Sequence, residues 1–365
     1  MKEILLGLIG KLFKKNVVSF FLRLFWGLKK IDYIFIVHSR DYSDFFRKYP
    51  FLKFFPIVIV KIIIRFLLPF PVCKIKGLTD KNNNKIYGAF IAVPADAEFL
   101  LKNRKKALKK IINSIKLGIN LGAEYFGLGA LSASLSGNGI YLDFLKKKYN
   151  IVITTGHSYT CWNITQNVYD IINYFKKDIS QLTLAIVGAD GSIGSTCFDI
   201  LKNDFKKIIL IDKKYNEAKW KNKYLFYSNN IFDIDNADVI IAATNAPYSI
   251  INDDKFIKKN AILIDDAQPI NISKNVLDKR HDLIVIEGGV SHHDKVSYKL
   301  NLNFVDKGDI FSCLAEVMIL SISTKKEFAI LGKTNPTLVN QLGILGENLG
   351  FRRAKFRSFG RSILE

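Results

Sequence analysis

The feature that most constrains the fold is a stretch of twenty residues, LTLAIVGADGSIGSTCFDIL, which runs from Leu182 to Leu201. It has the pattern of a buried strand, a glycine-containing turn and a helix. A second apolar strand follows in KKIILIDKKY, with Asp212 at its end. Further apolar runs come at α/β spacing in ADVIIAAT, AILIDDA and DLIVIEGG. Together these segments predict a doubly wound parallel sheet over about residues 181–300.

The turn in this stretch carries three glycines at GxxGxxG spacing, a variant of the Rossmann fingerprint: Gly188, Gly191 and Gly194. The first permits the tight turn, the second lets backbone amides approach a pyrophosphate, and the third lets the helix pack closely on the sheet. The helix N-terminus then faces the phosphates with its partial positive charge. We therefore predict a dinucleotide site, with the candidate residues Gly188, Ala189, Asp190, Gly191, Ser192, Ile193, Gly194, Asp212, Lys213 and Thr244.

The form of the dinucleotide depends on the residues at the end of the second strand. Asp212 is placed to accept hydrogen bonds from the adenosine ribose, which favours NAD. The neighbouring Lys213 and Lys214 could instead hold the 2′-phosphate of NADP. The residues alone leave this choice open.

The chain is long enough for more than one domain, at 365 residues. Strands alternate with helices before the glycine turn as well, which predicts a second α/β unit. We expect a hydrophobic leader over 1–30, an N-terminal α/β substrate domain over 31–160 and a Rossmann domain over 161–305. A helical region with a basic tail completes the chain over 306–365.

Charge and cysteine content limit the class of protein. The chain has 54 Lys and Arg against 33 Asp and Glu, a net charge of +21, which favours an acidic partner or general lysine richness. Four widely spread cysteines form no CxxC pair, so we expect no disulfide framework and no metal site, and a reducing compartment. No RNA-binding signature is visible, so no nucleic-acid partner is expected.

Two strongly hydrophobic segments, residues 1–30 and 57–71, combine Leu, Ile and Phe with scattered Lys and Arg. Their apolar runs are too short to span a bilayer. Each fits a helix that lies in a membrane interface, and each fits a helix buried in the core. We therefore expect a cytoplasmic protein, with association at the inner face of the membrane as an open alternative.

The stretch GDIFSCLAEVMIL, residues 308–320, holds the candidate nucleophile Cys313. If Asp309 caps a helix here, Cys313 lies in its first turn, where the helix dipole favours a thiolate. Glu316 shares a helix face with Cys313 and is costly in so apolar a segment unless it is paired or lies at a functional cleft. A salt bridge to a lysine is its other interpretation.

Two histidines are candidate acids or bases, because each follows an expected strand and histidine titrates near neutral pH. They are His157 and His293. Either could protonate an oxygen or a leaving thiol. A structural hydrogen bond is the alternative role for both.

Five stretches, in the same order, resemble the long-chain acyl-[acyl-carrier-protein] reductases: FGLGALSASL, TTGHSYT, IVGADGSIGS, VIEGGVSHH and FSCLAEVMIL. The resemblance covers roughly residues 85–350. It implies a thioester on Cys313, a role for His293 and reduction by NADPH, with NADH as the alternative. The chain departs from the family at His157, where asparagine is usual, at LIDDAQP, where a glycine pair is expected, and at Asp212.

We therefore expect an NAD(P)H-dependent enzyme that reduces a fatty acyl thioester to an aldehyde through an acyl-enzyme on Cys313. The thioester would be carried by acyl-carrier protein or coenzyme A. Two alternatives remain from the residues. One is a dehydrogenase of the amino-acid or shikimate type without covalent catalysis. The other is a basic membrane-surface protein on a degenerate Rossmann scaffold.

Overall fold

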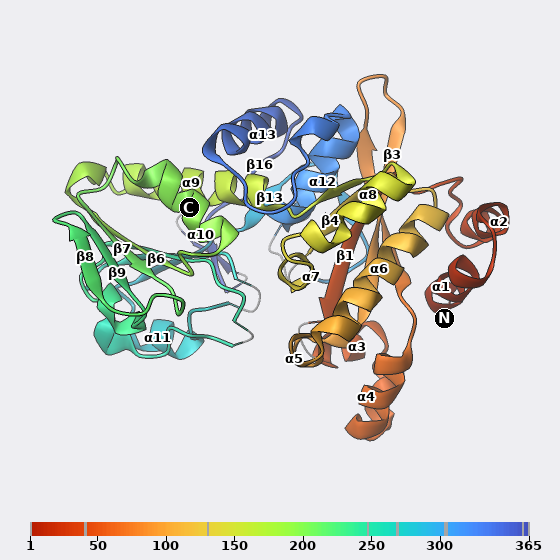
Figure 1. The fold of residues 1–365 in the computed structure, drawn as a ribbon, viewed down its shortest axis with the longest axis horizontal. Coiled ribbons are helices and arrows are strands. Elements are labelled where there is room, and N and C mark those ends of the chain that lie inside the picture. Colours follow the sequence, from red (N-terminus) through yellow and green to blue (C-terminus); the bar gives the residue numbers. More distant parts are fainter. Residues whose placement is uncertain are drawn as a thin grey trace. The chain divides into compact units, whose positions relative to one another are not determined.

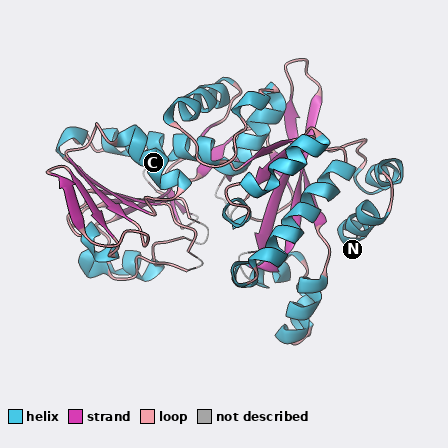
Figure 2. Cartoon of the chain, in the orientation of Figure 1, coloured by secondary structure: helices cyan, strands magenta, loops and turns pink. Residues whose placement is uncertain are grey.

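The computed structural model describes residues 2–39, 42–129, 131–246, 248–267, 270–302, 306–359 and 361–363. Its internal contacts divide the chain into two compact units, which are described one at a time below. Unit 1 comprises Met1–Gly156, Asp294–Leu302 and Cys313–Gly332. Unit 2 comprises His157–His293, Asn303–Ser312 and Lys333–Glu365. Each unit is a sheet with helices packed against it, so the predicted α/β fold is confirmed (Figures 1 and 2).

The sheet of unit 1 has six strands in the order β14-β2-β3-β1-β4-β5. Strands β3, β1, β4 and β5 run parallel, whereas β2 pairs antiparallel with β3 and β14 antiparallel with β2. Residues 80–84, which include three asparagines, form the turn of the hairpin between β2 and β3. The strands are β1 (Tyr33–Ser39), β2 (Phe70–Thr79), β3 (Lys85–Asp96), β4 (Tyr125–Leu128), β5 (Val152–Thr154) and β14 (Ser297–Tyr298).

Helices cover this sheet because their apolar stripes match its buried strands. In α6, Ala107, Ile111 and Ile115 are buried at helical spacing while lysines fill the outer face. The helices of unit 1 are α1 (Lys2–Leu12), α2 (Lys15–Trp26), α3 (Tyr42–Lys48), α4 (Ile57–Phe66), α5 (Ala97–Lys102), α6 (Arg104–Asn120), α7 (Leu131–Leu135), α8 (Asp143–Tyr149) and α12 (Ser312–Ser323). Short 3-10 turns are η1 (Pro50–Phe54), η2 (Ile140–Leu142) and η6 (Lys326–Phe328).

The hydrophobic leader forms helices α1 and α2, and one face of each belongs to the core of unit 1. Leu6 in α1, and Val18 and Leu22 in α2, are fully buried in the same apolar cluster as Ile34 of β1. The leader is therefore part of the folded unit on that side. Among the described residues, no helix is both long and apolar enough to cross a bilayer.

The main sheet of unit 2 has seven strands in the order β12-β11-β10-β6-β7-β9-β8, all parallel except β8. Alternate residues of a strand face opposite sides. Leu184 and Ile186 pack with α9 and α10, whereas Ala185 and Val187 pack with α11 on the other face (Figure 1). The strands are β6 (Thr183–Val187), β7 (Lys207–Ile211), β8 (Lys219–Asn222), β9 (Leu225–Ser228), β10 (Val239–Ala242), β11 (Ile262–Asp265) and β12 (Ile284–Glu287).

The remaining elements of unit 2 surround this sheet. The helices are α9 (His157–Tyr174), α10 (Ser192–Leu201), α11 (Lys274–Lys279) and α13 (Pro336–Asn348), with 3-10 turns η3 (Ile179–Gln181), η4 (Ile231–Ile234) and η5 (Asp254–Phe256). A small sheet joins β15 (Asp309–Phe311), β13 (Val290–His292) and β16 (Arg352–Arg353). A short hairpin joins β17 (Arg357–Ser358) and β18 (Arg361–Ser362).

The C-terminal sixty residues differ from the helical region expected over 306–365. They contain helices α12 and α13 but also strands β15 to β18. Residues 313–332 belong to unit 1 and the flanking residues to unit 2. The contacts thus divide the chain after Gly156 and in the C-terminal part, rather than into the four consecutive ranges expected from the sequence. Chain order cannot reveal such a division, because segments far apart in sequence share one core.

Candidate functional site

The glycine turn lies at the switch point of the unit 2 sheet. Strand β6 has β7 on one side and β10 on the other, and the chain leaves β6 directly into the turn and α10. In open α/β sheets, ligands bind at the carboxyl ends of strands where the strand order reverses. The turn is therefore at the position that a dinucleotide would use.

The three glycines of the turn are required for different reasons. A Cβ on Gly194 would collide with the carbonyl oxygen of Gly188, and Gly188 itself has φ +86°. Both are needed by the fold. Gly191, the N-cap of α10, has an ordinary φ of −67°, and a Cβ there would lie 3.1 Å from the Gly188 oxygen and 4.0 Å from that of Ala243. Gly191 therefore leaves room beside the helix N-terminus, as close approach of a pyrophosphate requires.

Asp212 lies at the end of β7 and is tied to the glycine turn. Its two carboxylate oxygens accept hydrogen bonds from the backbone N–H groups of Asp190 and Lys214, each at 3.0 Å. The ammonium of Lys214 also forms an ion pair with the Asp190 carboxylate, and this pair raises the pKa of Lys214. Lys213 is exposed. This edge of the candidate site thus holds two carboxylates and two lysines.

Three further residues of the predicted dinucleotide site lie in or beside the glycine turn. Ala189 is buried, and Ile193 is half-buried against the apolar cluster under α10. Thr244 follows β10, lies beside Gly188 and donates its hydroxyl proton to Asn271 at 2.8 Å. The structure therefore gathers the turn, Asp212 and Thr244 at one edge of the sheet.

Ser192 opens α10 and contacts His157, which opens α9. Nδ1 of His157 lies 3.0 Å from the Ser192 hydroxyl. Burial lowers the pKa of His157 to about 4, so the ring is neutral near pH 7. A neutral ring in hydrogen-bond contact with Ser192 can hold the start of α10 in place, which is a structural role. The lowered pKa differs from the titration near neutral pH that was expected of His157.

Cys313 is the second residue of α12, within the first helical turn. Its backbone and Cβ lie against Gly156, where φ is +77° and a side chain would collide with Cys313. Cys313 is partly exposed, whereas Cys73, Cys161 and Cys197 are buried. The predicted cap is wrong, because Asp309 belongs to strand β15 and the helix begins at Ser312. The thiol nevertheless lies at the helix N-terminus, where the dipole favours a thiolate.

Glu316 lies one turn further along α12, with 1% of its surface exposed. Its carboxylate accepts a hydrogen bond from the hydroxyl of Thr154 at the end of β5. The same hydroxyl accepts the backbone N–H of Gly156 at 3.4 Å. Glu316 is thus joined through Thr154 to the glycine that packs against Cys313. Sequence reasoning missed Thr154, although the TTG motif and the lone acid in an apolar helix were both visible.

His293 follows β13 in unit 2, with 7% of its surface exposed. Its ring packs on Phe351, with centroids 4.6 Å apart, and Gly350 keeps space beside Nε2. Its backbone N–H donates to the carbonyl oxygen of Gly308 at 3.0 Å. These contacts hold the His293 ring in one place within unit 2. Cys313 and Glu316 belong to unit 1.

A buried ionic network in unit 2 was not foreseen from the sequence. Asp309 contacts Nδ1 of His292 at 2.7 Å and Nη1 of Arg357 at 2.9 Å, and Arg357 also lies 3.1 Å from Glu287. Arg357 is only 2% exposed. The basic tail therefore contributes a core residue, which its sequence of scattered arginines did not indicate.

The LIDDAQP motif covers the last residues of β11 and the loop after it, with Asp265 buried and Asp266 half-buried, while Gln268 and Pro269 lie outside the described residues. Asp265 accepts the backbone N–H groups of Ala267 at 2.9 Å and Ile272 at 3.0 Å. Burial raises the pKa of Asp265 to about 7 and that of Asp266 well above its usual range. Asp265 thus holds the backbone of the loop after β11.

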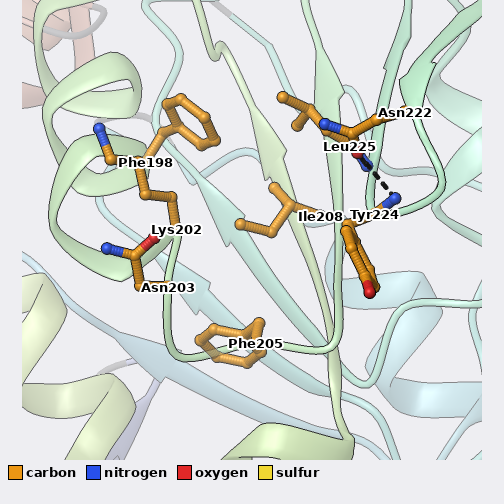
Figure 3. A pocket seen from close by; sticks show the side chains of 8 residues that line it. All are labelled: Phe198, Lys202, Asn203, Phe205, Ile208, Asn222, Tyr224 and Leu225. Carbon is orange, nitrogen blue, oxygen red and sulfur yellow. Dashed lines mark hydrogen bonds between the residues drawn. The ribbon is translucent and has the colours of Figure 1, made fainter.

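A hollow of about 230 Å³ in unit 2 is distinct from the candidate dinucleotide site (Figure 3). It lies between the C-terminal end of α10, the start of β7 and the start of β9, and Figure 3 shows Phe198, Ile208 and Leu225 around it. The glycine turn is at the opposite end of α10. Within the described ranges, no group of three His, Cys, Asp or Glu side chains is placed to hold a metal ion.

Comparison with known proteins gives distant likenesses. No protein-family model matches the chain. It is 24% identical over 261 residues to a long-chain acyl-[acyl-carrier-protein] reductase of Synechococcus elongatus, covering 67% of this chain and 75% of that protein. It is 23% identical over 308 residues to the aminotransferase PigE of a Serratia species, covering 80% of this chain and 35% of PigE. The chain thus spans about a third of PigE and three quarters of the reductase.

Solved structures are similar only at low scores. A shikimate dehydrogenase of Peptoclostridium difficile has a TM-score of 0.36 at 12% identity, with 88% of this chain and 98% of that chain covered. A D-lactate dehydrogenase of Lactobacillus jensenii has a TM-score of 0.28 at 16% identity, with 87% and 94% covered. The sequence comparison supports a distant relationship to an oxidoreductase and does not assign the chain to a particular family.

Proposed function

We propose that this chain is a nicotinamide-dependent reductase that converts an acyl thioester to an aldehyde through an acyl-enzyme on Cys313. Three features support the proposal. The glycine turn of unit 2 has the geometry of a dinucleotide cradle, with space at Gly191. Cys313 lies partly exposed at a helix N-terminus. The chain is also similar, at 24% identity, to a protein named as a long-chain acyl-[acyl-carrier-protein] reductase.

In the first step, the thiolate of Cys313 attacks the carbonyl carbon of the acyl thioester. A new carbon–sulfur bond forms to Cys313, the bond to the carrier sulfur breaks, and the carrier thiolate takes up a proton. The positive end of the α12 dipole stabilises the Cys313 thiolate that this step requires. Gly156 has no side chain to obstruct the approach to Cys313.

In the second step, the acyl carbon is reduced. A nicotinamide cofactor, which the Gly188–Gly194 turn would hold, would supply the hydride, two electrons with one proton. The resulting thiohemiacetal oxygen takes up a proton, and His293 is the proposed donor because it matches the family's histidine. The carbon–sulfur bond then breaks, the hydroxyl proton is released, and aldehyde and Cys313 thiolate are formed. Glu316 and Thr154 act as positioning residues, because they fix the Gly156 turn against Cys313.

The carrier and the cofactor form are proposed from the same likeness. Acyl-carrier protein is the proposed carrier, with acyl-coenzyme A as the alternative. NADPH is the proposed reductant, with Lys213 and Lys214 as the cations available to its 2′-phosphate. Asp212 argues for NADH instead, because its carboxylate repels a 2′-phosphate. Initial rates with the two cofactors distinguish these forms, and a large preference for NADH would assign the ribose contact to Asp212.

The single observation that carries the proposal is the position of Cys313, so the test is made there. Incubation with an acyl-carrier-protein thioester, without cofactor, should add one acyl mass to the chain. Adding reduced nicotinamide cofactor should remove that mass and release aldehyde. Cys313→Ser should form no aldehyde, lowering the rate by more than about 10³-fold, while dinucleotide binding is retained. Cys197→Ser, at a buried cysteine, is the matched control and should remain acylated on Cys313.

The second candidate function is a dehydrogenase that reduces or oxidises a small substrate without covalent catalysis. It rests on the glycine turn alone, which requires no nucleophile. If no acyl adduct forms and Cys313→Ser retains turnover, the covalent mechanism is wrong and this second function is favoured.

A further inference from the structure

Helix α4 of unit 1 carries an apolar face that is turned to solvent. Its most exposed side chains are hydrophobic, and the exposed fraction reaches 83% for Phe66. The preceding turn η1 adds Phe54, which is 89% exposed. The face is formed by Val58, Ile59, Ile62, Ile63 and Phe66, to which Phe51, Phe54 and Phe55 are added from η1 and the residue after it.

The opposite side of α4 is already used for folding. Val60 and Ile64 are buried and pack in a small cluster with Phe45 and Leu52. The helix therefore has one apolar side that stabilises unit 1 and a second apolar side that does not. Contiguous exposed apolar surface of this kind marks a docking surface.

The leader helices repeat this arrangement on the same unit. The inner faces of α1 and α2 are in the core, while Leu12, Phe20 and Leu24 are each more than 60% exposed. In Figure 1, α1, α2 and α4 all lie on the outside of the sheet of unit 1. The exposed face of α4 and the outer faces of the leader helices are thus both apolar surfaces of unit 1.

Charge identifies the partner of these surfaces. Residues 4–31 contain six basic side chains and residues 45–79 contain seven, and neither stretch contains an Asp or Glu. Apolar side chains flanked by Lys and Arg are the composition that binds an anionic bilayer, since lipid tails receive the former and headgroups the latter. A second copy of this chain is a poor partner, because an isologous contact would bring two such basic surfaces together.

We propose that the exposed faces of α4 and the leader helices bind the surface of an anionic lipid bilayer. Helix α4 has ten residues and is about 15 Å long, half the thickness of a hydrocarbon core, so it lies in the interface and does not cross it. The basic tail takes a smaller part than its sequence indicates. Arg357 is buried in its ionic network, and Arg353 is paired with Asp170 and Glu347.

Removing the leader is not a clean test, because Leu6, Val18 and Leu22 belong to the core and their loss would destabilise unit 1. Substitutions on α4 leave the core intact. The test variant is Ile62→Ser with Phe66→Ser. The matched control is Phe144→Ser with Ile344→Ser, since these side chains are also exposed, at 50% and 48%, but lie on α8 and α13.

The full chain is mixed at low salt with vesicles of phosphatidylcholine containing phosphatidylglycerol, and with vesicles of phosphatidylcholine alone, and bound protein is sedimented. We expect wild type and control to bind the anionic vesicles, and binding to weaken as salt is raised. The α4 variant should bind at least about tenfold more weakly while its thermal unfolding stays unchanged. A second variant, Lys53→Glu with Lys14→Glu, should lose binding to the anionic vesicles in particular.

Equal binding by the α4 variant and the wild type would overturn the proposal, as would absence of wild-type binding to anionic vesicles. A change of oligomeric state in the α4 variant without a change in vesicle binding would instead assign the surface to a second copy of the chain. None of these outcomes depends on whether Cys313 is acylated, so this proposal stands apart from the proposed reaction.

Discussion

Gly194 is needed for folding and Gly191 for cofactor binding, and two substitutions distinguish these roles. Gly194→Ala places a Cβ against the Gly188 carbonyl oxygen, so it should destabilise unit 2 by about 1–3 kcal/mol. Gly191→Ala meets that oxygen at 3.1 Å and should change the free energy of unfolding by less than about 1 kcal/mol. It should nevertheless weaken dinucleotide binding more than about tenfold, because the methyl occupies the space for the pyrophosphate. Urea unfolding and fluorescence titration with NADPH measure the two effects; equal binding by Gly191→Ala and wild type would contradict the site.

His157 gives the chain a predictable response to acid. Its pKa is lowered from about 6.5 in the unfolded chain to about 4 in the folded one, so folding favours the neutral ring. Its contribution to stability is complete above about pH 6.5 and is lost as the pH falls toward 4, to a maximum of about 3 kcal/mol. His157→Asn keeps a hydrogen-bonding group for Ser192 but does not titrate. Urea unfolding at several pH values should show a smaller acid loss in this variant, and parallel losses would rule out His157 as the cause.

At the scale of elements, the contact between the end of β5 and helix α12 determines where Cys313 lies. Thr154→Val removes the hydroxyl that donates to Glu316 and leaves a buried carboxylate without that donor, at a cost of about 1–3 kcal/mol. Since the same hydroxyl accepts the N–H of Gly156, we expect kcat to fall more than KM rises. Thr154→Ser keeps the hydroxyl and should retain both properties, as measured by urea unfolding and steady-state kinetics. Loss of both properties in Thr154→Ser would point to packing rather than to the hydrogen bond.

The elements of both sheets were largely predictable, because their residues have strong periodic patterns. The strand before the glycine turn, the helix after it and the four apolar runs that follow are all present, as β6, α10, β7, β10, β11 and β12. The start of α12 was not predictable. Asp309 looks like a helix cap in sequence, but its carboxylate pairs with His292 and Arg357, which are distant along the chain.

At the scale of the whole molecule, burial separates one cysteine from the other three. Cys73, Cys161 and Cys197 are buried, two of them completely, and Cys313 is partly exposed at a helix N-terminus. Iodoacetamide should therefore add one label to the native chain, on Cys313, and four labels in strong denaturant. Peptide mass spectrometry locates the label, Cys313→Ser should remove it, and rapid labelling of Cys161 or Cys197 would show that the core opens readily.

The sequence by itself determined the α/β class and the strand–turn–helix unit at Gly188–Gly194, because local periodicity and glycine spacing are properties of neighbouring residues. It also indicated a candidate nucleophile, which stays a prediction. Only the tertiary structure decided the partners of Glu316, His157 and Asp309, since each contacts a residue more than fifteen positions away. It also decided that the leader is buried on one side and exposed on the other. Which face of an apolar helix is buried depends on what packs against it, and a segment with hydrophobic residues on more than one face does not contain that information.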